Sequence, residues 1–441
     1  MRRLVVAFGT LLLRGFFRRI EVSHPEWFPK TGPVIYVLNH PNGLVDPLFI
    51  LSFAGRPVSF LAKEPLFHMF FIGWCLRQLD ALPVYRLKDN ADPKQNRKTF
   101  DDARALLLRG GSIALFPEGT SHSDPAMKPL KTGAARIALG AAALPESLPL
   151  RMVPVGLTYS RKQTFRSEAL VCVGEPFDCP HVAVPESGEP PSDAVHELTT
   201  RIGASLEKVT LHAERLETLR AIAFAHRVFT AEGEAGKADL AETLELERRI
   251  ATAEATLRPK NPELVREITE RVLAHGEALE ELGVAEHRLS PERLSFGFVA
   301  KRLGVSLLWL PLSLLALIGA LIALLPYRVT SLLARKASGG EEDELATVKV
   351  LSAALLYPVT WLVLAGIATA LYGPLAGLVT LSVAPALCYL ALVFREHLSG
   401  TVATFRAVWL WLFRRQAMLE LVEERRVLKE LMRSIAESLS V

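Results

Sequence analysis

Cysteine is scarce in this chain of 441 residues, whose four cysteines are Cys75, Cys172, Cys179 and Cys388. None belongs to a C-x-x-C pair, so neither a disulfide framework nor a cysteine-based zinc site is expected. Cys388 also lies in an apolar stretch. The pattern indicates reduced thiols on the cytoplasmic side of a membrane.

An excess of charge of either sign is also missing. Lysine and arginine number 51 against 47 aspartates and glutamates, which gives a formal net charge of +4 at pH 7. So weak a field, without a zinc-finger pattern or a basic-aromatic repeat, argues against a nucleic-acid partner. The mean hydropathy is +0.25. A value this high indicates apolar surface that lipid covers instead of water.

Two common hydrolase signatures do not occur. The H-E-x-x-H pattern is absent, so a metal enzyme that uses His40, Asp46, Glu118 and His122 ranks low, and no metal is expected. The G-x-S-x-G elbow of serine hydrolases is absent as well. A non-catalytic membrane scaffold that binds lipid stays open as an alternative.

The N-terminus resembles a signal peptide, with Arg2 and Arg3 before the apolar run Leu4–Leu13. No small-residue cleavage site follows, and three arginines follow within the next six residues, so we do not expect secretion. Residues 1–30 then have two interpretations. One is an amphipathic helix on an anionic membrane surface, and the other is a first helix packed on the fold.

Between residues 31 and 180, short apolar segments alternate with helical ones. The predicted helices include Asn96–Leu108 and Gly133–Ala143. The predicted strands are Val34–Leu38, Val58–Leu61, Leu82–Tyr85, Ser112–Phe116, Met152–Leu157 and Leu170–Val173. This alternation predicts an α/β domain with a mostly parallel central sheet.

Proline and charge divide the rest of the chain. Residues 181–193 are rich in proline and predict a linker, and residues 194–302 have helical periodicity. That helical extension is broken at Gly233 and Gly236 and again at Pro259 and Pro262. We expect it to be a spacer or packing unit without chemistry.

Residues 303–394 predict a membrane region, since 303–327 and 350–394 contain no charged side chain. One spanning helix needs about 20 apolar residues. The second segment is therefore long enough for two crossings, with a turn at 372–374, and Pro311 makes the first a bent dip. Residues 395–441 predict an amphipathic tail. Its arginines place it, like the α/β domain, on the cytoplasmic face.

A histidine and a carboxylate follow the first predicted strand of the α/β domain. His40 and Asp46 are separated by Pro41 and Gly43, which exclude one straight helix and supply a loop. Asp46 followed by Pro47 has the pattern of a helix cap, so the loop can fold His40 back onto it. The pair suits a general base with an orienting carboxylate. The alternatives are a loop histidine and an aspartate that only caps.

Two further segments end predicted strands with polar or charged groups that suit a ligand. Arg86 suits capture of a phosphate, although a surface charge is the alternative. The run 116–121 places Glu118, Gly119 and Thr120 at the carboxyl edge of the sheet, where such sheets bind ligands. Lys131 then precedes a helix whose N-terminus favours an anion.

Taken in order, these motifs and the strand 153–155 resemble the glycerolipid acyltransferase family, the lysophosphatidate acyltransferase-like enzymes. The resemblance covers residues 30–180. It implies that His40 is the general base and Asp46 its partner, and that Arg86 binds the acceptor phosphate. It also implies an acceptor pocket shaped by Glu118 and Gly119, and direct transfer from an acyl-CoA or acyl carrier protein thioester without a bound cofactor.

The spacing between the two catalytic groups departs from the common pattern. Five residues separate His40 from Asp46, where the family usually has four. This version, with Asp89-Asn90 and the run 121–123, resembles yeast-type glycerol-3-phosphate/dihydroxyacetone-phosphate acyltransferases. It implies phospholipid biosynthesis at a membrane, with a glycerol-phosphate acceptor and membrane lipids as partners. A 1-acyl-glycerol-3-phosphate acyltransferase is the alternative, and the oligomeric state stays open.

Overall fold

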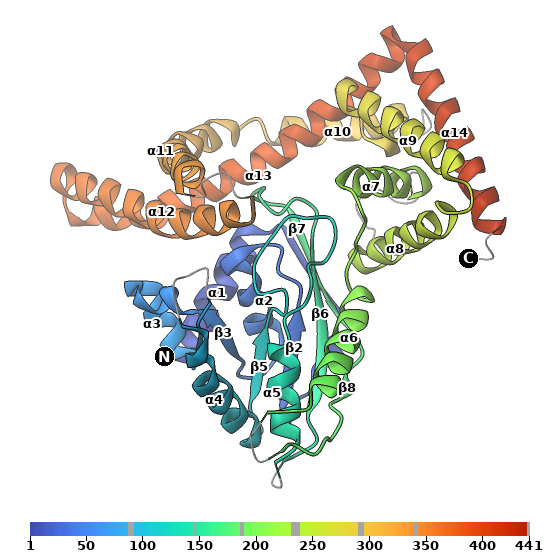
Figure 1. The fold of residues 1–441 in the computed structure, drawn as a ribbon. Helices are drawn as coiled ribbons and strands as arrows, with labels where there is room; N and C mark the ends of the chain where they lie inside the picture. The colour runs from blue at the N-terminus through green and yellow to red at the C-terminus, as the bar shows by residue number, and fades with distance from the viewer. Residues whose placement is uncertain are drawn as a thin grey trace. The chain divides into compact units, whose positions relative to one another are not determined.

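The computed structural model describes residues 1–86, 92–144, 147–185, 189–230, 239–289, 295–337 and 342–438. Asp89, Asn90, Gly233 and Gly236 lie outside these ranges. The chain forms two compact units (Figure 1). The first comprises Met1–His212 and Ala337–Val350, and the second comprises Ala213–Lys336 and Leu351–Val441.

An eight-stranded sheet forms the centre of the first unit, in the order β1-β7-β6-β2-β5-β3-β4 with β8 beside β6. Its strands are β1 Arg19–Ser23, β2 Val34–Leu38, β3 Ser59–Lys63, β4 Leu82–Val84, β5 Ser112–Leu115, β6 Arg151–Tyr159, β7 Glu168–Val173 and β8 Phe177–Asp178. Only the pairings of β6 with β7 and with β8 are antiparallel. The predicted mostly parallel sheet is confirmed.

Helices cover both faces of this sheet (Figure 1). They are α1 Arg2–Phe16, α2 Asp46–Phe53, α3 Phe70–Gln78, α4 Asn96–Leu108, α5 Gly133–Ala142 and α6 Ser192–Glu207. Strand β2 is buried along its whole length because both of its faces are covered. Val34, Tyr36 and Leu38 pack in the core with α1 and α2, whereas Ile35 and Val37 pack in the core with α4, α5 and α6.

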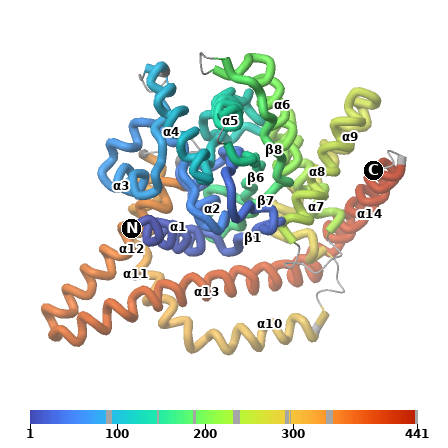
Figure 2. The backbone as a smooth tube through the Cα atoms, turned by 90° about the horizontal axis from the view of Figure 1, so that it is seen from below, coloured from blue at the N-terminus to red at the C-terminus, as the bar shows by residue number. Residues whose placement is uncertain are grey.

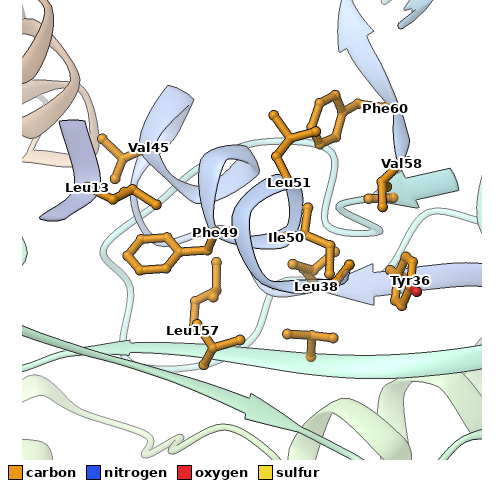
Figure 3. Close-up of a cluster of buried hydrophobic side chains, with 14 of the residues drawn as sticks. Leu13, Tyr36, Leu38, Val45, Phe49, Ile50, Leu51, Val58, Phe60 and Leu157 are labelled. Carbon is orange, nitrogen blue, oxygen red and sulfur yellow. The ribbon is translucent and has the colours of Figure 1, made fainter. Parts of the chain in front are cut away.

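Helix α2 carries the apolar side chains that seat it on the sheet. Phe49 and Ile50 are fully buried. Figure 3 shows Phe49 between Leu13 of α1 and Leu157 of β6. The start of α2, which holds Asp46, is therefore fixed relative to the end of β2.

The first unit extends beyond the predicted α/β segment at both ends. Helix α1 packs against α2 through Leu13 and Phe16, which are buried, while Leu4 and Leu11 stay exposed. Helix α6 packs against the sheet, because its buried side chains join the core around α5. Residues 337–350 include the first turns of helix α12, Glu342–Tyr372.

The second unit is all-helical. Its helices are α7 Leu216–Thr230, α8 Leu240–Leu257, α9 Pro262–Leu282, α10 Phe296–Leu308, α11 Ser313–Ala337, α12, α13 Pro374–Phe413 and α14 Arg415–Ser438. The prolines at 259 and 262 fall at the predicted break between α8 and α9. Pro311 falls between α10 and α11, as expected from its missing N–H group.

Three of these helices are long and apolar enough to cross a membrane, and they comprise Ser313–Lys336, Leu345–Tyr372 and Pro374–Phe413. The predicted turn between α12 and α13 is present at Gly373, whose φ of 91° favours glycine. Helix α13 then runs without a break to Phe413 (Figure 2). Most side chains of these segments lie on the surface of the isolated chain, which suits a lipid environment.

Candidate active site

The end of strand β2 is fixed to strand β6 just before the loop 40–45, called the catalytic loop below because it carries the candidate base His40. The Asn39 amide donates to the Leu157 carbonyl at 3.0 Å and accepts from the Leu157 N–H at 2.7 Å. These two hydrogen bonds hold β2 to β6 at the carboxyl edge of the sheet. His40 therefore starts from a defined position.

His40 and Asp46 form the predicted pair. The His40 Nδ1 lies 2.8 Å from Asp46 Oδ2, and the aspartate side chain is fully buried. A carboxylate only accepts hydrogen bonds, so Nδ1 carries the proton and Nε2 is left as the proton acceptor. The His40 side chain is 17% exposed, and its Nε2 has no hydrogen-bond partner among the described residues. This arrangement suits a general base.

The expected capping role of Asp46 is wrong. Helix α2 begins at Asp46 itself, with Val45 at the cap position and no side-chain cap hydrogen bond. The carboxylate turns back instead and accepts from the Asn42 N–H at 2.7 Å. The five-residue spacer makes this possible, since Gly43–Val45 forms a 3-10 turn that brings Asp46 under His40. The pairing with His40 is therefore the interpretation that the geometry favours.

A third side chain contacts the pair from strand β6. The Tyr159 hydroxyl donates to Asp46 Oδ1 at 2.5 Å. Burial, followed by the Asp46 carboxylate, raises the pKa of Tyr159 well above its usual value, so the phenol keeps its proton at neutral pH. The sequence analysis missed Tyr159. The available signal was its place near the end of a strand parallel to β2, because such ends meet at one edge of a sheet.

The Glu118 carboxylate is buried, and its hydrogen-bond partners are groups of neighbouring loops. It accepts from the His40 N–H at 3.4 Å and from the Lys128 N–H at 2.9 Å. Its other contact is the His122 Nε2, and the His122 N–H donates to the His40 carbonyl at 3.1 Å. Glu118 thus joins its own loop to the His40 loop. His212 lies near this cluster, where burial lowers its pKa and the Glu118 charge acts in the opposite direction.

The predicted anion-binding residues gather around one turn. Arg86 donates from Nη1 to the Gly119 carbonyl at 3.1 Å, and the Lys131 N–H donates to the Pro117 carbonyl at 2.7 Å. Gly119 has a φ of +72°, and the Lys131 Cγ would lie 3.4 Å from a Cβ added there. Thr120 follows, half-buried. Two cations and a glycine turn therefore lie together next to Glu118.

The other supports of the catalytic loop were also missed from sequence. The Lys162 ammonium donates to the Pro41 carbonyl at 2.8 Å and to the Ser123 hydroxyl at 2.6 Å. The Leu44 N–H donates to the Thr347 hydroxyl at 3.0 Å. His40 itself stacks on Phe116 at 3.9 Å between ring centroids. These contacts join residues far apart in sequence, so only the fold reveals them.

The segment that contains these residues is similar to known proteins. Residues 19–158 match the family model described as Acyltransferase. Glycerol-3-phosphate O-acyltransferase 1 of Saccharomyces cerevisiae is 27% identical over 377 residues, which are 66% of this chain and 49% of the yeast protein. Glycerol-3-phosphate O-acyltransferase 2 of the same yeast is 34% identical over 139 residues, covering 32% of this chain and 19% of that protein.

A chloroplastic 1-acyl-sn-glycerol-3-phosphate acyltransferase of Arabidopsis thaliana is 30% identical over 135 residues, 30% of this chain and 36% of that protein. Its match covers less of the chain than that of the first yeast protein, which extends over about two thirds of it but only half of the yeast protein. Residues 19–158 therefore match an acyltransferase domain model, and the chain is similar to the two yeast glycerol-3-phosphate O-acyltransferases.

Proposed function

We propose that this chain is a membrane-bound O-acyltransferase of phospholipid biosynthesis. It transfers a fatty acyl group from a thioester to a hydroxyl of glycerol 3-phosphate or of dihydroxyacetone phosphate. The observation that carries the proposal is the His40–Asp46 pair, at 2.8 Å, beside the Arg86–Gly119 turn. A base and a phosphate-binding turn at one sheet edge suit a glycerol-phosphate acceptor.

In the proposed reaction, His40 Nε2 takes the proton of the acceptor hydroxyl as its oxygen attacks the thioester carbonyl. Collapse of the tetrahedral intermediate breaks the C–S bond and forms the ester C–O bond. The imidazolium then returns the proton to the leaving thiolate. Because the acceptor oxygen attacks the thioester directly, no acyl-enzyme forms. Asp46 stabilises the imidazolium by its charge, as carboxylates do for catalytic histidines.

Arg86 and Lys131 would hold the acceptor phosphate, with Gly119 and Thr120 lining the same turn. Glu118 shapes this pocket by fixing the two loops, because its hydrogen bonds already go to His40, His122 and Lys128. The small acceptors and the alternative acceptor, 1-acyl-glycerol 3-phosphate, all carry a phosphate. The cations therefore do not discriminate between them, and the space beside Glu118 must do so.

A membrane surface is the proposed site of the reaction, with the active site on the cytoplasmic face. Helix α1 exposes Leu4 and Leu11, and the neighbouring helix α3 exposes Phe70, at 95%, and Phe71. The ring of Phe71 meets that of Phe8 edge-on at 6.5 Å between centroids. Exposed aromatic and leucine side chains suit insertion into the headgroup region. The product, a lipid, would then leave directly into the bilayer.

The test is a purified full-length protein in lipid nanodiscs, supplied with labelled acyl-CoA or acyl carrier protein thioester. Each acceptor is offered separately: glycerol 3-phosphate, dihydroxyacetone phosphate and 1-acyl-glycerol 3-phosphate. We expect acylation of one or both small acceptors. Activity on the 1-acyl acceptor alone would instead establish the second-step function that the Arabidopsis relative's name describes. Loss of all transfer with every pair would leave only a lipid-binding scaffold.

A further inference from the structure

The two oxygens of the buried Asp46 carboxylate have separate partners. Oδ2 accepts from the His40 Nδ1 at 2.8 Å and from the Asn42 N–H at 2.7 Å. Oδ1 accepts from the Tyr159 hydroxyl at 2.5 Å. With all three donors in place, the plane of the carboxylate is fixed. Without the phenol, Oδ1 would have no hydrogen-bond donor among the described residues.

Tyr159 is itself held rigidly. Its backbone pairs with Ala169 across the antiparallel β6–β7 ladder. Its ring stacks on Phe17 at 5.5 Å between centroids and meets Phe49 at 5.8 Å. The Phe17 and Phe49 rings also contact each other, at 5.5 Å between centroids, and a phenol packed in such a cluster has little freedom to turn away from the carboxylate. The hydroxyl therefore lies where it can fix Asp46.

We infer that Tyr159 is a positioning residue for acyl transfer, whose hydroxyl orients Asp46 so that Oδ2 receives the His40 Nδ1–H and Nε2 faces the acceptor hydroxyl. The effect of Tyr159 on acyl transfer rests on the proposed function, whereas its effect on the His40 imidazole can be measured without a substrate. The phenol also withdraws negative charge from the carboxylate. This keeps the attraction of Asp46 for the imidazolium below what an undonated buried carboxylate would exert.

A purely structural tyrosine would act through its ring alone, so the test removes only the hydroxyl. Tyr159→Phe keeps the ring packed against Phe17 and Phe49. The matched control is Tyr36→Phe. Tyr36 lies on β2 of the same sheet, and its buried hydroxyl has no hydrogen-bond partner within the described part of the chain. Both variants lose one buried hydroxyl, but only one of the two hydroxyls contacts the catalytic pair.

In Tyr159→Phe we expect kcat to fall about tenfold, with KM for acceptor and donor within about twofold of wild type. We expect the acidic limb of the pH–rate profile to move upward by about half a pH unit, because the carboxylate then holds the imidazolium proton more strongly. Tyr36→Phe should leave kcat and the pH profile unchanged.

A readout that needs no activity is deuterium exchange at the His40 ring C2–H, followed by mass spectrometry against pH. Its midpoint should move upward in Tyr159→Phe and stay in place in Tyr36→Phe. A Tyr159→Phe protein with the wild-type profile and exchange midpoint would overturn the inference, even if it melted at a lower temperature. If wild type transferred no acyl group at all, the proposed function would fail, while the exchange midpoint would still decide the role of Tyr159.

Discussion

At the scale of single residues, the proposed chemistry depends on one imidazole, that of His40, whose two nitrogens have different surroundings. Nδ1 faces the buried Asp46, while Nε2 has no hydrogen-bond partner among the described residues. Such a division of donor and acceptor is what a general base requires. The backbone N–H of the same residue bonds to Glu118, which links the base to the neighbouring loop.

His40→Ala should lower acyl transfer about 10²–10⁴-fold, the usual contribution of a positioned general base, while the protein still folds. Asp46→Ala should be less severe, because the base remains although it loses its orientation. The measurement is turnover of purified variants, with melting temperature as a check on folding. His68→Ala is the control, since this histidine is 75% exposed and pairs with Glu64 of the same segment. Wild-type turnover in His40→Ala would refute the mechanism.

Arg86→Ala should raise the acceptor KM and leave the donor KM unchanged. A hydrogen bond to a charged group contributes about 1.5–3 kcal/mol, which corresponds to roughly ten- to hundredfold in KM. Steady-state kinetics with each substrate varied in turn measure this. Arg136→Ala is the matched control, because Arg136 forms a surface ion pair with Glu189 at 2.6 Å. An unchanged acceptor KM would mean that Arg86 only supports the turn, through its contact with the Gly119 carbonyl.

The separate motifs could be predicted from sequence because each follows an apolar strand that ends in a turn. Their meeting at one place could be expected from the parallel sheet. The role of Tyr159 could not be predicted, since a tyrosine in a strand is ordinarily read as packing. Its hydroxyl reaches Asp46 across 113 positions of sequence, a distance over which periodicity carries no information.

At the scale of elements, the buried strands and the edge strand β4 were predicted, whereas β1 and β8 were not. Strand β2 was predicted with its observed bounds because its five residues are all apolar and buried. Strand β1 was missed, since Arg19 and Glu21 alternate with apolar residues next to a helix that ends at Phe16. Strand β8 has two residues and gives no pattern. The packing of α6 on the sheet was missed too, because its amphipathic pattern matches that of α7–α9.

Helix α8 contains a half-buried acid, Glu247, that makes the free energy of unfolding depend on pH. Burial raises the pKa of Glu247 to about 7, with Arg227 opposing the shift. A raised folded-state pKa means that the protonated form is favoured by folding. The stabilisation is complete below the unfolded value near 4.5 and is lost as pH rises through 7.

Glu247→Gln should therefore stabilise the protein at pH 8 by up to about 3 kcal/mol and have no effect at pH 4.5. Melting temperatures of wild type and variant, measured at both pH values, test this. Glu242→Gln on the same helix is the control, because Glu242 is exposed. Equal melting temperatures of the Glu247 variant and wild type at pH 8 would mean that this carboxyl is solvated.

At the scale of the whole molecule, the first unit constrains how the chain crosses a membrane. The chain leaves this unit after His212 and returns to it at Ala337. On return, Thr347 bonds the catalytic loop and the Lys349 ammonium donates to the Gln163 carbonyl at 2.8 Å. We therefore expect the start of α12 to lie on the same side of the membrane as the candidate active site.

Between departure and return lies one described segment that is long and apolar enough to cross, Ser313–Lys336. A chain that starts and ends on the same side must cross an even number of times, so we expect α11 to dip into one leaflet without crossing. Helices α12 and α13 then cross in opposite directions. This arrangement returns Arg414 and Arg415 to the cytoplasmic side, in agreement with the positive-inside rule.

Single cysteines in a variant without the four native ones would test this topology. With an impermeant maleimide on intact cells, we expect Tyr372→Cys, at the exposed turn between α12 and α13, to be labelled. Arg335→Cys and Arg433→Cys should be protected until the membrane is permeabilised. Three full crossings predict the reverse at every site, because α11 would carry Arg335 outside, α12 would return Tyr372 to the cytoplasm and α13 would export the tail. That outcome would also require α12 to begin across the membrane from the loop that Thr347 contacts, so the labelling tests that hydrogen bond as well.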